Sequence, residues 1–262
     1  MFRSTNPVLK EGLFSASGAF ADGEAMTVQG TVNKALIMLA LLVFGAAWVW
    51  QGVMPLIQSA QQGAGSLAAM QGKGMVLPFA LGGAIVGFIL AIVISFKPVW
   101  SGYLAPVYAL AEGFFIGGVS AFVEFMYPGL VMQAVLLTFA TLFCLLMAYK
   151  AGLIRVTEKF RTGMMVALGA IFLIYMINFV MGFFHASIPF VTGGGFFGIG
   201  FSLFVVGIAA LFLVLDFDLI ERGAESGAPK YMEWYSAFSL MVTLVWLYME
   251  ILNLLMKLRG RD

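Results

Sequence analysis

Four acidic side chains stand within otherwise apolar stretches of this sequence: Glu112, Asp216, Asp218 and Glu250. A carboxylate in hydrocarbon costs several kcal/mol, so it is expected to face the interior of a helix bundle, a partner or a water path. Carboxylates in such places can bind a cation or exchange a proton, and two that lie close together titrate as a unit. Cation binding coupled to protons is therefore the first functional hypothesis.

Asp216 and Asp218 lie two residues apart, so they point to nearly opposite sides of a helix at about 100° per residue. Arg222 follows Asp218 by one turn, a spacing that suits an ion pair near the membrane surface. Asp216 has Ile220 at the matching position and needs a partner from another helix. We expect an interfacial ion pair at Asp218, with a pore or gating role as the alternative.

Glu250 lies well inside the last apolar stretch, with Trp246 and Asn253 one turn away on the same helical face. We expect Glu250 to be protonated or paired, and Asn253 to be a candidate pore or gating residue beside it. Glu112 has Tyr108 one turn before it. A buried glutamic acid satisfied by Tyr108 and a pore-lining acid are both open interpretations of Glu112.

The elements that carry these residues are membrane-spanning helices. Of 262 residues, 62% are hydrophobic and 10% charged, whereas soluble proteins are about half apolar and a quarter charged. A bilayer core needs roughly 20 apolar helical residues per crossing. Seven runs of this kind are separated by short connections, of which the first (58–74) is polar and glycine-rich: 35–57, 75–95, 103–125, 129–149, 163–184, 196–220 and 234–256.

The fold class is therefore an all-α membrane protein with seven transmembrane helices. Residues 34–262 are expected to form one transmembrane domain and residues 1–33 a cytoplasmic N-terminal tail. Small residues four apart allow helices to approach closely. Gly83 with Gly87, Gly113 with Gly117 and Gly194 with Gly198 fit this spacing, and we expect them to pack helices within the chain rather than to form a dimer.

Orientation follows from the basic residues. If the seven helices alternate, ten Lys and Arg fall on the side of the N-terminus and four on the other side, including Lys257, Arg259 and Arg261. Because basic residues are enriched in cytoplasmic loops, the N-terminus is predicted inside and the C-terminus outside.

Several function classes are disfavoured by what the sequence lacks. Its net charge is +1, with no basic stripe of the kind that binds nucleic acid. Cys144 and His185 are single residues of their types, so no metal centre built from cysteine and histidine is expected. No HExxH, GxSxG, phosphate-loop or Cys–His signature is found. We therefore expect no enzymatic activity and no cofactor, a calcium ion apart.

Three segments near the C-terminus resemble the end of the Bax inhibitor family: LDFDLIER at 215–222, GAPKYMEWYSAF at 227–238 and VTLVWLYMEILNLL at 242–255. The segment AEGFFIGG at 111–118 is similar to a glycine-rich helix of that family that carries a glutamate. NPVL at 6–9 and MTVQGTVNKA at 26–35 resemble its bacterial branch. The resemblance extends over nearly the whole chain and is most specific in the last fifty residues.

This resemblance implies a seven-helix fold whose last helix is surrounded by the others, and a pH-sensitive calcium leak across the membrane. It also implies a sensor made of two acids, one near the end of the sixth helix and one in the seventh. Asp216 and Glu250 stand at these positions, 34 residues apart, with Glu in place of the family's second Asp. Both are candidate calcium ligands and together a candidate pH latch.

The leading hypothesis is thus a calcium or other cation leak channel in which buried acids form a proton-sensitive closure. The alternative is a non-conducting membrane regulator that binds a protease or another membrane assembly through the tail 1–33. In both cases the expected surroundings are the lipid bilayer, within the cytoplasmic membrane of a bacterium.

Overall fold

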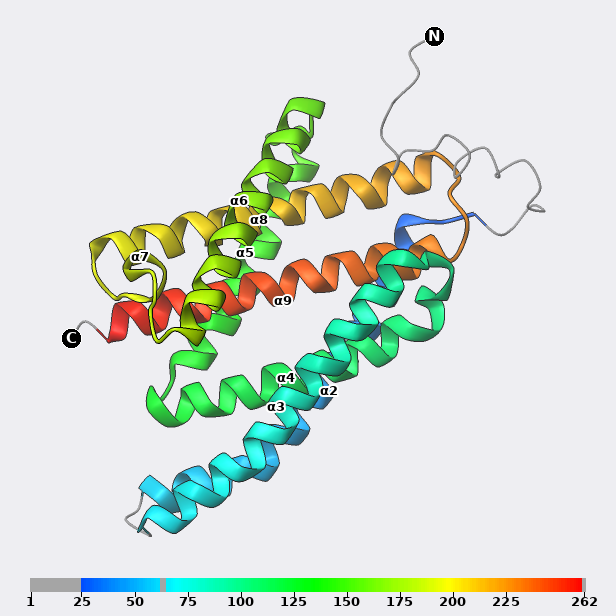
Figure 1. Ribbon diagram of the computed structural model, residues 1–262. Coiled ribbons are helices and arrows are strands. Elements are labelled where there is room, and N and C mark those ends of the chain that lie inside the picture. Colours follow the sequence, from blue (N-terminus) through cyan, green and yellow to red (C-terminus); the bar gives the residue numbers. More distant parts are fainter. Residues whose placement is uncertain (1–24, 62–64, 261–262) are drawn as a thin grey trace.

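A computed structural model describes the backbone of residues 25–61 and 65–260 and, within them, side chains outside 56–76 (Figure 1). Most of the predicted tail, residues 1–24, therefore lies outside the described part, as do Arg261 and the side chain of Lys73, which both belong to the charge count. The helices are α2 (Val28–Gln61), α3 (Gly65–Phe96), η2 (Pro98–Trp100, a 3-10 helix), α4 (Ser101–Met126), α5 (Leu130–Lys150), α6 (Glu158–Phe183), α7 (Pro189–Thr192), α8 (Phe196–Glu225) and α9 (Met232–Arg259).

Seven of these helices are long and apolar enough to cross a membrane, as the sequence predicts. The described residues contain no β-strand beyond a single bridge between Ala25 and Pro229. The predicted first connection is largely helical, since α2 extends to Gln61 and α3 begins at Gly65. Ala, Gln, Leu and Met are good helix formers, so polarity alone did not end these helices.

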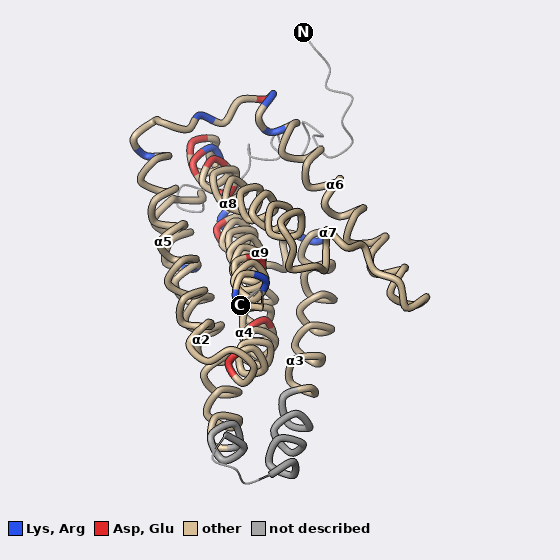
Figure 2. The backbone as a smooth tube through the Cα atoms, turned by 90° about the vertical axis from the view of Figure 1, so that its left-hand side faces the viewer, with Lys and Arg blue, Asp and Glu red and all other residues tan. Residues whose placement is uncertain are grey.

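The last helix, α9, lies at the centre of the bundle, which confirms the expected architecture. It packs against α2, α4, α5 and α8, while α3 packs on α2 and α4. More than half of the most apolar window of α9 (56%) is buried inside the protein, against 11% for α6. Viewed nearly along α9, the other helices stand around it (Figure 2).

Glycines allow α4 to approach α2 and α3 closely. A Cβ atom at Gly113 would lie 2.3 Å from the Leu42 carbonyl oxygen of α2. A Cβ atom at Gly83 of α3 would lie 2.5 Å from the Ala111 carbonyl oxygen of α4. Both are far inside van der Waals contact, so the predicted role of these small residues in packing within the chain is confirmed.

The two helices that carry Asp216 and Glu250, α8 and α9, form an antiparallel hairpin (Figure 1). Their connection is only the six residues 226–231. In such a hairpin, residues at equal distances from the turn face each other. This register decides which residues of α9 each acid of α8 can reach.

Replacing Gly113 with Ala is expected to destabilise the bundle by about 1–3 kcal/mol, because the new methyl group overlaps the α2 backbone. The matched control is Gly200→Ala in α8, where a Cβ atom would meet nothing within 4 Å. Thermal unfolding in detergent micelles compares the two variants. Equal melting temperatures would show that the close α2–α4 contact is absent.

Candidate functional site

One face of α9 carries a row of polar side chains, here called the polar strip: Ser239, Thr243, Trp246, Glu250, Asn253 and Lys257. They recur every three or four residues, which places them on one side of a helix. From Ser239 to Lys257 the strip rises by 18 residue steps, or about 27 Å at 1.5 Å per residue, close to the roughly 30 Å of a bilayer core. It faces α6, α7 and α8, with which its members form hydrogen bonds.

Asp216 meets the strip near its N-terminal end. The Ser239 hydroxyl donates a hydrogen bond of 2.6 Å to Asp216 Oδ1, so the partner comes from another helix, as predicted. Asp216 is only 6% exposed, yet its Oδ2 has no hydrogen-bond partner among the described residues. The Ser236 hydroxyl, one turn before Ser239, is also buried without a partner there. Unpaired buried oxygens call for a proton, water or an ion.

Glu250 occupies the middle of the strip and is 6% exposed. The Tyr175 hydroxyl of α6 lies 2.9 Å from Oε1 and 3.1 Å from Oε2, and donates to this carboxylate. The Trp246 indole N–H donates to Oε1 at 3.2 Å, from the turn that the sequence indicates. Asn253 lies half-buried one turn further along. Two aromatic donors therefore hold Glu250 at the α6–α9 contact.

The structure does not bring Asp216 and Glu250 together. Asp216 contacts Ser239, and Glu250 is 11 residues further along the same helix, about 16 Å away along its axis. The two carboxylates are too far apart to share a proton or to bind one calcium ion, so the predicted direct latch is not formed. The hairpin register is the reason, because Asp216 and Ser239 lie at similar distances from the turn.

Asp218 forms the predicted ion pair. The Arg222 Nε donates to Asp218 Oδ1 at 2.9 Å, and Arg161 of α6 adds a second contact of 2.9 Å to Oδ2. The carboxylate is thus fully engaged at the end of α8 where the α5–α6 connection also lies. Nothing in this arrangement favours a pore role for Asp218.

Glu112 lies on a different helix pair from the polar strip. It is half-buried on α4, and its Oε1 would be 2.7 Å from a Cβ atom placed on Gly87 of α3. Its neighbour Tyr108 is buried and packs edge to face on Phe238 of α9, with ring centroids 4.9 Å apart. The carboxylate of Glu112 therefore lies at the α3–α4 contact and not between α8 and α9.

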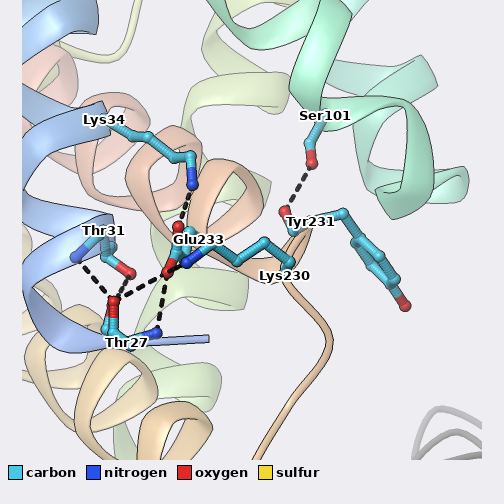
Figure 3. A network of polar contacts seen from close by, with 8 residues as sticks. Thr27, Thr31, Lys34, Ser101, Lys230, Tyr231 and Glu233 are labelled. Carbon is cyan, nitrogen blue, oxygen red and sulfur yellow. Dashed lines mark hydrogen bonds and ion pairs between the residues drawn. The ribbon is translucent and has the colours of Figure 1, made fainter. Parts of the chain in front are cut away.

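An acid that sequence reasoning passed over, Glu233, anchors the start of α9 (Figure 3). Its side chain is fully buried and accepts hydrogen bonds from Lys230 at 2.8 Å and from the Thr27 amide and hydroxyl at 2.9 Å. Lys34 of α2 pairs with its other oxygen. The three-residue spacing of Lys230 and Glu233 was the one local signal, whereas Thr27 and Lys34 are remote in sequence.

Lys257 does not lie free beyond the last span, where the count of basic residues placed it. Its side chain is 8% exposed and hydrogen-bonds within the protein, so it is not a free loop cation. A basic side chain therefore lies inside the bundle, on the face of α9 that carries Glu250. Its spacing of two turns from Glu250 on one helical face could have revealed this.

A cavity of about 320 Å³ lies apart from the strip, between α2, α4, α5 and α9. Its walls are almost entirely apolar, and the Ser120 and Tyr248 hydroxyls on it bond to each other at 2.7 Å. Such a lining does not suit ions. Within the described residues, no three His, Cys, Asp or Glu side chains gather in a way that could hold a metal ion.

A comparison with protein-family models matches residues 6–260 to the family described as Bax inhibitor 1 like. The chain belongs to the Bax inhibitor 1-like family. No curated protein and no solved structure matched it in the parallel comparisons. The family match covers all seven apolar helices, and with them it establishes an integral membrane protein whose outer helices contact the bilayer. The resemblance of the C-terminal segments to Bax inhibitors is thereby confirmed.

Replacing Glu233 with Gln is expected to destabilise this Bax inhibitor-like protein by about 3 kcal/mol, since Lys34 and Lys230 would then lack their buried counter-charge. Glu225→Gln is the control, because Glu225 is exposed and forms no ion pair within 4 Å among the described residues. Thermal unfolding in detergent measures both. A melting temperature of Glu233→Gln equal to that of the control would contradict the anchoring role.

Proposed function

We propose that this protein is a proton-sensitive cation leak channel whose route follows the polar strip of α9, with calcium as a transported ion rather than a resident one. The strip itself is the observation that supports the proposal. It extends about 27 Å, and two carboxylates lie along it at separate depths, Asp216 of α8 beside Ser239 near one end and Glu250 in the middle. Oxygen ligands of this kind suit hard cations such as Ca²⁺.

Asp216 supplies the first station on this route. Among the described residues, neither Asp216 Oδ2 nor the Ser236 hydroxyl has a hydrogen-bond partner, so both oxygen atoms can contact a cation. The Ser239 hydroxyl holds the carboxylate in place at 2.6 Å. A partly dehydrated cation entering from the α8–α9 turn would meet these oxygens before it reached Glu250.

Glu250 and Tyr175 supply the closure in this proposal, in place of a pair of acids. Tyr175 lies on α6, the least buried of the seven spans, and its hydroxyl covers both oxygens of Glu250. A cation can bind Glu250 only when the carboxylate is ionised and Tyr175 has moved. Because an ionised carboxylate attracts cations and a protonated one does not, cation flux should rise as pH rises.

The proposed orientation has the N-terminus in the cytoplasm and the C-terminus outside. Lys and Arg residues gather along the α5–α6 connection (Figure 2), and Arg222 of α8 donates a hydrogen bond to the Val156 carbonyl of that connection. The burial of Lys257 removes one cation from the opposite side of the count. Placement in a bacterial cytoplasmic membrane rests on the resemblance of segments 6–9 and 26–35.

Calcium flux into proteoliposomes, followed with an internal calcium dye between pH 6 and pH 8, tests the proposal. Glu250→Gln should lower the flux about tenfold and flatten its pH dependence, because losing one attractive charge in a path of low dielectric is worth about 1–2 kcal/mol. Asp216→Asn should lower it too, while Tyr175→Phe should raise it by freeing Glu250.

Glu225→Gln, an exposed acid away from the strip, should behave like the unchanged protein in this assay. If all four variants conduct at the rate of the unchanged protein, the cation route does not follow the polar strip. If the unchanged protein passes no cation at any pH, the non-conducting regulator becomes the better interpretation.

Topology reporters test the orientation. Alkaline phosphatase, which is active only outside the cytoplasm, should be active when fused after Asp262 and inactive when fused before Met1. Green fluorescent protein should give the reverse pattern. A fluorescent C-terminal fusion would overturn the proposed orientation, which rests on the distribution of basic residues.

A further inference from the structure

The final member of the polar strip, Lys257, lies in a cage of neutral oxygen atoms. Its Nζ donates to the Val191 carbonyl at 2.6 Å, to the Ser202 hydroxyl at 2.8 Å and to the Gly198 carbonyl at 3.4 Å. These oxygens belong to α7 and to the first two turns of α8. All three ammonium donors are used, and no described carboxylate lies within 4 Å of the nitrogen.

A buried ammonium group is costly unless its charge is compensated. Structural lysines usually meet a carboxylate, as Lys34 and Lys230 meet Glu233 in this protein. Lys257 instead meets backbone carbonyls and a hydroxyl, the ligands that replace the water shell of a cation in ion pathways. Its ammonium group thus occupies a place with the chemistry of a cation site.

The position of this cage relative to Glu250 matters. Lys257 follows Glu250 by seven residues, or about 10 Å along the helix, and Asn253 lies between them on the same face. Both side chains are buried, so the repulsion between Lys257 and a cation at Glu250 is only weakly screened by salt. A cation that leaves Glu250 toward the C-terminal end of α9 must pass this positive charge.

We propose that Lys257 is a built-in cation that closes the C-terminal end of the polar strip and sets the rate at which cations pass it. The inference rests on the proposed channel function and names a further residue that determines it. Lys257 acts through its charge, by repelling a cation that comes from Glu250, and through its bonds, by tying α7 and the start of α8 to α9.

Flux measurements on Lys257 variants in proteoliposomes test this role. Lys257→Met removes the charge at similar length and is expected to raise calcium flux roughly tenfold, the effect of removing one like charge at about 10 Å inside a protein. Lys257→Arg keeps the charge and should keep the flux low. Lys97→Met is the control, because Lys97 is exposed and its ammonium lies over the Trp100 ring, away from the strip.

Chemical rescue separates loss of charge from loss of structure. Lys257→Ala should conduct strongly, and added methylammonium, which fits the vacated oxygen cage, should suppress that flux by at least half while leaving the unchanged protein unaffected. Thermal unfolding identifies variants that fail to fold. Should Lys257→Met be one of them, Lys257→Gln retains hydrogen-bond donors without the charge and decides the question.

The outcomes distinguish this inference from the proposed function. If the unchanged protein conducts and the folded neutral variants conduct at the same rate, Lys257 is no barrier and the inference is overturned while the channel stands. If neither the unchanged protein nor any folded variant conducts, the channel function is lost and the barrier with it.

Discussion

The polar side chains of the central helix α9 need hydrogen-bond partners from the protein, because the hydrocarbon of a bilayer offers none. Because α9 is buried among its neighbours, every charge that it carries into the membrane has to be satisfied by another element. Ser239 meets Asp216 of α8, Glu250 meets Tyr175 of α6, and Lys257 meets oxygens of α7 and α8. The helices α6, α7 and α8 thus supply the hydrogen-bond partners for one face of α9.

The register of the α8–α9 hairpin places the polar contacts of α9 at separate depths along the helix. Its short connection places Asp216 opposite Ser239, so Glu250 falls in the middle of the bundle and Lys257 at its far end. An acid pair in one place would make a single closed contact. The two acids and the buried ammonium group instead lie at three separate depths along one helix.

The helix α6 packs less tightly against the bundle than the other helices do. Only Met164 and Ile171 are buried along its length, and polar side-chain contacts join it to α8 and α9 in its first turn and again in its second half. Arg161 bonds Asp218 at one end, and Tyr175 bonds Glu250 further along. Because few of its side chains are buried inside the protein, α6 depends on these polar contacts more than the other helices do.

The sequence by itself determined the spans, the family and the contacts that depend on local spacing, such as the Asp218–Arg222 pair and the glycines at 83 and 113. Composition and helical periodicity carry this information directly. Only the tertiary structure decided that Asp216 meets Ser239, that Tyr175 covers Glu250 and that Lys257 is buried. These facts depend on the register and facing of helices remote in sequence, which the packing of the whole bundle settles.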